Sequence, residues 1–148
     1  MPKTNAVKKK VVSKSKRGKL ARAAGARFEL KVRADLENTG WIVSKWMNTI
    51  DLQEKKLVKV KNKFFGPGKP MMLGAGFPDF IAFRRKNQAY EVIGVEVKIR
   101  GYLDKEEKEK GSWYLKNKVF SKILIAKPVK EKRIIKIEYL DFSKKYEK

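Results

Sequence analysis

The sequence predicts an α/β fold, and two patterns carry this prediction. From Gly18 to Asn38, apolar side chains recur every four residues, which is the spacing of one face of a helix. Short runs rich in Val, Ile, Phe and Trp follow, and these are typical of strands. We expect the order helix, strand, insert, two strands, helix and two strands. The 148 residues are enough for one domain with a substantial core.

Composition limits the classes of function. With 38 Lys and Arg against 16 Asp and Glu, the net charge is +22. Such a field attracts polyanions, so nucleic acid is the expected partner and an acidic membrane surface the weaker alternative. No apolar run approaches the roughly 20 residues that span a bilayer, and no secretory signal is present. We therefore expect a cytoplasmic, nucleoid-associated protein.

The residue types that are missing also constrain the chemistry. The chain has no Cys, which excludes disulfides and thiolate metal sites, and no His, the commonest general base and zinc ligand. Any hydrolysis must then rely on carboxylates, lysines and water.

The N-terminal part of the chain is basic. Residues 1–17 contain no acid and no apolar period, which predicts a disordered arm that lies along a phosphate backbone or only aids solubility. The helix from Gly18 uses the apolar stripe Leu20, Ala24, Phe28, Val32 and Leu36, with Gly40 as its stop. For nucleic-acid contacts around this helix we predict Arg17, Lys19, Arg22 and Arg27.

Glu29 lies beside Phe28, at the margin of the apolar stripe. It is either a functional acid or a surface glutamate paired with Arg33, four residues on.

A short strand is expected at residues 41–46, followed by a basic insert at residues 47–73 that forms either an extra hairpin or a long loop. Basic residues interleaved with aromatic ones suit a nucleic-acid groove, although Phe64 and Phe65 could equally be buried. The predicted contacts in the insert are Lys55, Lys56, Lys61 and Lys63. Asp51 is a weaker candidate for an extra acid at the site.

The stretch from Gly74 to Arg100 contains two strand-like runs joined by a polar turn. Because side chains alternate along a strand, Glu96 and Lys98 share one face, while Val95, Val97 and Ile99 point into a core. If the two runs pair, Asp79 comes close to Glu96 and Lys98. Two convergent carboxylates suit a hard cation, Mg²⁺ or Mn²⁺ in its place. The bland alternative is a surface turn and an ordinary amphipathic strand.

The rest of the chain predicts a charged helix from Asp104 to Lys116, with Asp104 as its N-cap and Leu103, Trp113 and Leu115 on its buried side. Strands are expected at residues 121–126 and 134–140, and a charged tail at 144–148.

Pro78-Asp79, a spacer and Glu96-x-Lys98 resemble the core of the PD-(D/E)XK nucleases. The stretch from Gly25 to Val32 is similar to the first helix of archaeal Holliday-junction resolvases and VRR-NUC domains. The resemblance covers most of residues 18–142 and implies a restriction-endonuclease-like αβββαβ core, with a mixed central sheet flanked by helices.

The resemblance also implies roles for individual residues. Asp79 and Glu96 would bind Mg²⁺ together with the backbone carbonyl of Val97, and Glu29 would hold a second metal or a water. Lys98 would act on the attacking water or on the scissile phosphate. The position at which relatives carry a glutamine in the next helix falls on Glu107, which leaves open whether that residue, or the nearby Lys105, contacts the site.

The expected function is therefore a metal-dependent DNA endonuclease, selective for structures such as junctions or flaps, and the resemblance to resolvases implies a homodimer. Two alternatives remain: a non-catalytic nucleic-acid-binding module that keeps the nuclease fold, and a basic ribosome- or RNA-associated protein, for which the charge alone would suffice.

Overall fold

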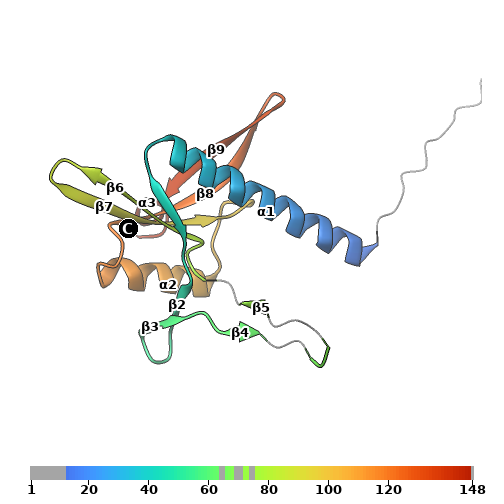
Figure 1. Cartoon of the computed structure of the whole chain (residues 1–148), viewed down its shortest axis with the longest axis horizontal. Coiled ribbons are helices and arrows are strands. Elements are labelled where there is room, and N and C mark those ends of the chain that lie inside the picture. The colour runs from blue at the N-terminus through green and yellow to red at the C-terminus, as the bar shows by residue number, and fades with distance from the viewer. Residues whose placement is uncertain (1–12, 64–65, 69–71, 74–75, 148) are drawn as a thin grey trace, which may run out of the picture.

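The computed structural model describes residues 13–63, 66–68, 72–73 and 76–147. A five-stranded sheet in the order β1-β6-β7-β8-β9 lies at the centre, with helices on both faces (Figure 1). Its strands are β1 Ile42–Lys45, β6 Phe80–Lys86, β7 Ala89–Val97, β8 Lys122–Glu131 and β9 Ile134–Asp141. The pair β7–β8 is parallel and the other pairs are antiparallel. The predicted α/β class with a mixed sheet is confirmed.

Helix α1, Lys14–Asn38, covers one face of the sheet. Phe28, Val32 and Leu36 are its buried residues, and they join a core cluster with side chains from β1, β6, β7 and β8. The predicted apolar stripe is only partly right, because Leu20 is 54% exposed. Only the C-terminal half of the helix packs on the sheet.

The N-terminal boundary of α1 also differs from the prediction. Ser13 is the N-cap, and its hydroxyl accepts a hydrogen bond from the Lys16 amide, so residues 14–17 of the predicted arm are helical. Residues 1–12 of that arm lie outside the described residues.

Helices α2, Lys105–Lys116, and α3, Phe142–Tyr146, cover the opposite face. Asp104 is the N-cap of α2, as predicted. Of the predicted buried side, Leu103 is fully buried and Trp113 and Leu115 are partly buried, whereas Tyr114 is the most deeply buried residue of this helix.

Helix α3 replaces the first part of the predicted tail, because the Asp141 carboxylate caps the amides of Ser143 and Lys144. Phe142 is fully buried, and its ring comes within 2.6 Å of the position that a side-chain carbon on Gly111 would take. Gly111 has a low helix propensity, but its missing side chain makes room for α3.

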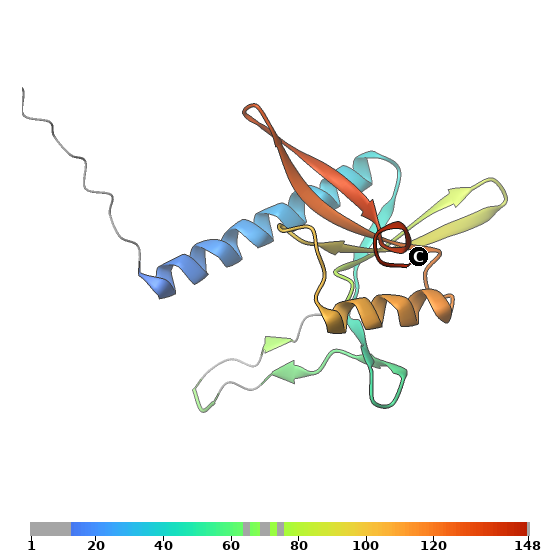
Figure 2. The same cartoon turned by 180° about the vertical axis from the view of Figure 1, so that it is seen from behind.

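Strands β8 and β9 form a hairpin that extends past the sheet (Figure 2). The pairing of β8 with β7 ends at Ala126, while its pairing with β9 continues to Glu131. The predicted strand at 121–126 is thus too short. Beyond Ala126 the strand has one neighbour instead of two, so it is polar there and accommodates Pro128.

The insert contains extra hairpins, which was one of the two predicted alternatives. Strand β2, Asn48–Asp51, pairs with β3, Lys56–Lys59, and β4, Asn62–Lys63, pairs with β5, Met72–Leu73. Phe64 and Phe65 lie outside the described residues. Across the described chain, none of the helices has the length and apolar character needed to cross a membrane.

Candidate metal and catalytic site

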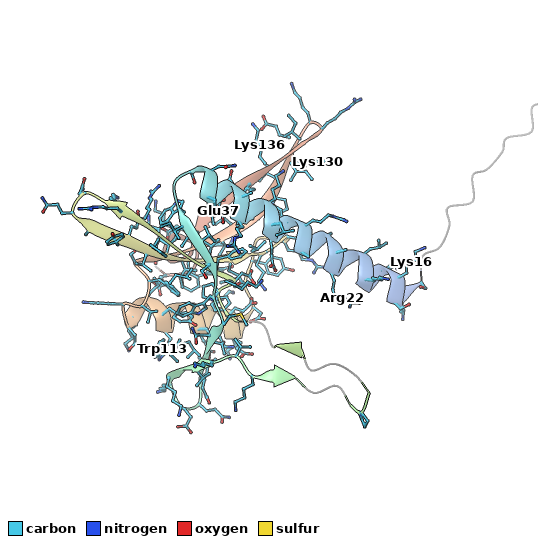
Figure 3. All side chains as sticks on the ribbon, in the orientation of Figure 1. Lys16, Arg22, Glu37, Trp113, Lys130 and Lys136 are labelled. Atoms are coloured by element: carbon cyan, nitrogen blue, oxygen red, sulfur yellow. The ribbon has the colours of Figure 1, made fainter. Side chains whose placement is uncertain are left out.

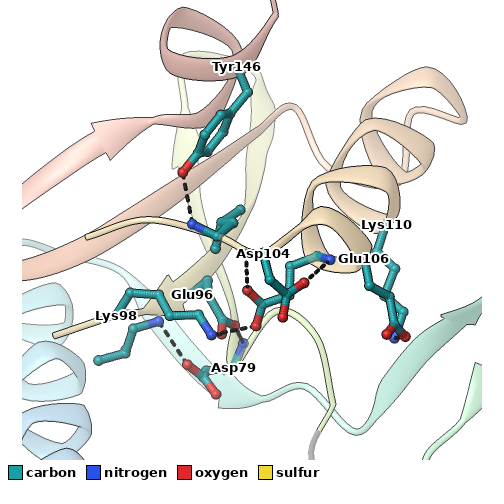
Figure 4. Close-up of polar contacts among 10 residues, drawn as sticks. Asp79, Glu96, Lys98, Asp104, Glu106, Lys110 and Tyr146 are labelled. Atoms are coloured by element: carbon teal, nitrogen blue, oxygen red, sulfur yellow. Dashed lines mark hydrogen bonds and ion pairs between the residues drawn. The ribbon is translucent and has the colours of Figure 1, made fainter. Parts of the chain in front are cut away.

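The candidate site forms where β6 begins and β7 ends. The register pairs Phe80 with Val95, which brings the next residues, Asp79 and Glu96, together. The Asp79 amide donates a 3.0 Å hydrogen bond to Oε2 of Glu96, and the Val97 amide donates one of 2.8 Å to Oδ2 of Asp79 (Figure 4). Each carboxylate is thus fixed by a backbone amide of the other strand. The structure brings the two predicted ligands together.

Burial sets the electrostatics of this pair. Glu96 is only 6% exposed, and burial followed by the nearby charge of Asp79 raises its pKa well above the ordinary value. Burial also raises the pKa of Asp79, to about 6, although the hydrogen bond from Val97 opposes the rise. Two buried acids that resist ionisation gain most from a cation that removes the cost of their charge.

Lys98 is held at the same place. Its Nζ lies 3.5 Å from Oε1 of Glu96 and also donates a hydrogen bond to Oε1 of Glu107. Burial lowers the pKa of Lys98, but the hydrogen bond to Glu107 and the charges of both glutamates outweigh it, and the pKa is raised above 10.5. Lys98 is therefore an ammonium ion at neutral pH.

Glu107 belongs to a capping box at the start of α2. Its Oε2 accepts a 3.0 Å hydrogen bond from the Asp104 amide, and Oδ1 of Asp104 accepts one of 2.8 Å from the Glu107 amide. One carboxylate therefore starts the helix and holds Lys98. The question that the sequence leaves open, whether Glu107 contacts the site, is answered by this contact. Lys105 appears in none of the polar contacts at the site that the structure describes.

Glu29 lies at the rim of the site rather than inside it. Its Oε2 is 2.9 Å from Nζ of Lys45, the last residue of β1. The predicted alternative partner, Arg33, instead pairs with Glu37. The charges of Glu29 and Lys45 both affect the pKa of Asp79, which places the ion pair within electrostatic range of the buried acids.

Lys45 is a site residue that sequence reasoning missed. Val43 is buried, and alternation along β1 places Lys45 on the same face, toward α1. Its Nζ lies 5.5 Å from the centre of the Phe80 ring. That alternation is the signal that could have identified it.

Hydrogen bonds through Tyr114 of α2 hold the loop that leads into Asp79. The Tyr114 hydroxyl donates a 2.6 Å hydrogen bond to the Phe77 carbonyl and accepts one of 3.0 Å from the Trp46 indole. Gly94 allows Pro78 to pack against β7, because a side-chain carbon there would lie 2.7 Å from Cγ of Pro78. These contacts position the buried start of β6.

The donors present fit a hard divalent cation. Asp79 and Glu96 offer neighbouring carboxylate oxygens at the joined ends of β6 and β7, and Mg²⁺ commonly takes one or two carboxylates, with water and substrate oxygens completing its shell. Within the described ranges, no group of three or more Asp, Glu, His or Cys side chains could hold a metal, so the site has two carboxylates and not a full protein cage.

Other predicted residues are placed as follows. Ile99 is 49% exposed and not in the core, because β7 ends at Val97. Asp51 caps a turn through the amides of Gln53 and Glu54, and it takes no part in the described polar contacts that join Asp79, Glu96, Lys98 and Glu107.

The predicted nucleic-acid contacts lie on α1 and in the insert. Those whose side chains the structure describes form no ion pair within the described part of the chain. Exposed on α1 are Arg17, Lys19, Arg22 and Arg27, and in the insert Lys55, Lys56 and Lys61. Lys63 belongs to β4, and its side chain lies outside the description.

No family model matches the chain, and comparisons with curated proteins and with solved structures give no match either.

Proposed function

We propose that the protein is a metal-dependent DNA endonuclease. The observation that carries the proposal is the buried pair Asp79 and Glu96, joined across two strands, with the Lys98 ammonium beside it. Burial of Glu96 and partial burial of Asp79 and Lys98 at strand ends is costly for folding and contributes little to the core. Such a group is better explained by chemistry than by stability.

In this proposal Asp79 and Glu96 bind Mg²⁺, or Mn²⁺ in its place, with the Val97 carbonyl completing the protein ligands. The cation would polarise the scissile phosphate and favour ionisation of the attacking water. Glu29, paired with Lys45 at the rim, would orient a water or a second cation.

The charge state of Lys98 favours one of the two roles expected for it. Because its pKa is raised, Lys98 is a poor proton acceptor at neutral pH. It would instead donate hydrogen bonds to the phosphate and stabilise the negative charge that develops during cleavage.

The charge of +22 supports a nucleic acid as substrate, and the resemblance to resolvases and VRR-NUC domains supports branched DNA. A four-way junction or a flap is the proposed substrate class. The same resemblance suggests a homodimer, which would present two sites to the two strands of a junction.

The decisive experiment measures cleavage of labelled DNAs, including a four-way junction, a flap and a linear duplex, in Mg²⁺ and in EDTA. Wild type is compared with Glu96→Gln, and Glu131→Gln, which changes an exposed acid at the far end of β8, is the matched control. We expect Mg²⁺-dependent cleavage by wild type and by the control but not by Glu96→Gln. Binding without cleavage of every substrate would favour the non-catalytic module, and a preference for RNA the RNA-associated protein.

A further inference from the structure

The N-terminal half of α1 extends away from the sheet. Every residue from Lys14 to Arg27 is exposed or only partly buried, and the first buried residue of the helix is Phe28. Figure 3 shows Lys16 and Arg22 directed into solvent from this half. At about 1.5 Å per residue, these 14 residues give a free helix of roughly 20 Å.

This half of the helix carries positive charge alone. It contains six basic residues and no acid, and the first acid of the chain is Glu29. The six are Lys14, Lys16, Arg17, Lys19, Arg22 and Arg27.

Basic charge in this position works against an isolated helix. Its first turn holds no acid, and basic side chains near a helix N-terminus oppose the macrodipole. A short helix without tertiary packing is also marginally stable in water. A polyanion would remove both costs, so charge complementarity points to a partner with closely spaced negative charges.

The charges surround the helix and do not lie on one face. At 3.6 residues per turn, Lys16 and Arg27 point away from the centre of the buried stripe that Phe28, Val32 and Leu36 form, whereas Arg17 and Arg22 lie on its two flanks. A helix that lies on one flat anionic surface needs charge on one side. Charge on all sides suits a helix with phosphates on two sides, as in the DNA major groove, which is about 12 Å wide and admits a helix.

The position of this half relative to the candidate site matters as well. Glu29, whose ion pair with Lys45 lies at the rim of the site, is two residues beyond Arg27. Figure 1 shows the free end of α1 on the same side of the molecule as strands β4 and β5 of the insert. A duplex that enters the site from this side passes along the free half of α1.

We propose that residues 14–27 of α1 enter the major groove of the DNA duplex that flanks the cut position. This inference rests on the proposed function for its substrate, but residues 14–27, called the α1 arm from here on, bind DNA with or without catalysis.

The test compares two variants that each lose four positive charges. The first carries Arg17→Gln, Lys19→Gln, Arg22→Gln and Arg27→Gln. The matched control carries Arg85→Gln, Lys86→Gln, Lys116→Gln and Lys118→Gln, which are exposed positions on the β6–β7 hairpin and at the end of α2. Fluorescence anisotropy in EDTA measures binding to a 30-base-pair DNA duplex over a range of salt concentrations, so that no cleavage is needed.

We expect the arm variant to bind at least about tenfold more weakly than wild type. The slope of the logarithm of its binding constant against the logarithm of salt concentration should be shallower by about 2 to 4, whereas the control should keep most of the wild-type slope. Melting temperature and Mg²⁺ binding should not fall, because the arm residues lie outside the core. Equal losses in the two variants would overturn the inference and leave only a general effect of net charge.

Double-stranded RNA of the same sequence tests the groove itself. Its major groove is too narrow for a helix, so the arm substitutions should weaken RNA binding less than DNA binding. An equal loss on RNA would rule out insertion into the groove. If the arm variant loses DNA affinity and wild type cuts no substrate in Mg²⁺, the proposed nuclease activity is wrong and the proposed binding of the arm to DNA is supported. If wild type cuts DNA and the arm variant binds it as well as the control does, the proposed role of the arm is wrong and the proposed nuclease activity is supported.

Discussion

Lys98 and Glu107 form an ion pair that ties the end of β7 to the first turn of α2. Glu107 also accepts a hydrogen bond from the Asp104 amide, so the start of α2 and the position of Lys98 depend on one carboxylate. Lys98 itself is 29% exposed, which leaves it reachable by a substrate from solvent.

Two substitutions of Glu107 should separate these roles. Glu107→Gln keeps the capping box, because glutamine also serves at this position, and it keeps an acceptor for Lys98. We expect a stability near that of wild type and a cleavage rate within about threefold of the wild-type rate. The hydrogen bond to Lys98 remains, and the loss of the charge on its acceptor costs on the order of 1 kcal/mol or less. Glu107→Ala removes both contacts, so the free energy of unfolding should fall by about 1 kcal/mol and cleavage by roughly tenfold. Urea unfolding and single-turnover cleavage measure the two effects. Wild-type cleavage by Glu107→Ala would show that Lys98 needs no positioning by this residue.

Glu96→Gln should stabilise the metal-free protein. The amide oxygen can still accept the hydrogen bond from the Asp79 amide, while the buried charge and its repulsion with Asp79 disappear. Since one pKa unit corresponds to about 1.4 kcal/mol, we expect the free energy of unfolding at pH 7 to rise by on the order of 1 kcal/mol.

Thermal melting in EDTA and in Mg²⁺ checks this prediction. Mg²⁺ should raise the melting temperature of wild type, because a ligand that binds only the folded state stabilises it, and should leave Glu96→Gln unchanged. A loss of stability in EDTA would mean that the charged form of Glu96 supports the fold, and the interpretation of the pair as a metal site would lose its main physical argument.

Asp79 should make the stability of the metal-free protein depend on pH. Its pKa is raised from 3.8 to about 6, so the folded state holds a proton that the unfolded state releases. This contribution is fully present below pH 3.8 and is lost as the pH rises through about 6; a shift of this size is worth at most about 3 kcal/mol.

The comparison of wild type with Asp79→Asn isolates this contribution from other acids. In EDTA, the stability of wild type relative to the variant should fall between about pH 4 and pH 7. The effect of Mg²⁺ on the wild-type melting temperature should run in the opposite direction and vanish below about pH 6, since the ligand must be ionised to bind metal. A pH-independent difference would place Asp79 in a more solvated setting than the structure shows.

The centre of the site could be predicted from the sequence because it depends on local rules. Alternation along β7 places Glu96 and Lys98 on one face, and a short turn makes β6 and β7 pair, which brings in Asp79. The role of Asp104 as the N-cap of α2 could be predicted from the preference for Asp at that position alone.

The remainder depends on contacts between distant segments, which leave no local pattern. Lys45 reaches Glu29 across 16 residues, and Phe142 fills the space at Gly111 from the C-terminal helix. Leu20 fits the helical period of the core residues but lies beyond the edge of the sheet, so periodicity alone wrongly predicts its burial. Period shows which side of a helix is apolar, but not how much of the helix meets a partner.

Tyr114→Phe tests the support of the loop before Asp79. The hydroxyl is buried, burial raises its pKa to about 12, and it bridges the Phe77 carbonyl and the Trp46 indole. Its removal leaves a buried carbonyl without this donor, which should cost about 1–3 kcal/mol of unfolding free energy in urea. Because Phe77 is two residues from Asp79, the apparent affinity for Mg²⁺, measured by titration calorimetry, should weaken severalfold as well. Tyr102→Phe, which removes an exposed hydroxyl, is the control and should change neither quantity. A stable Tyr114→Phe protein with unchanged Mg²⁺ affinity would show that Pro78 packed on Gly94 is enough to position Asp79.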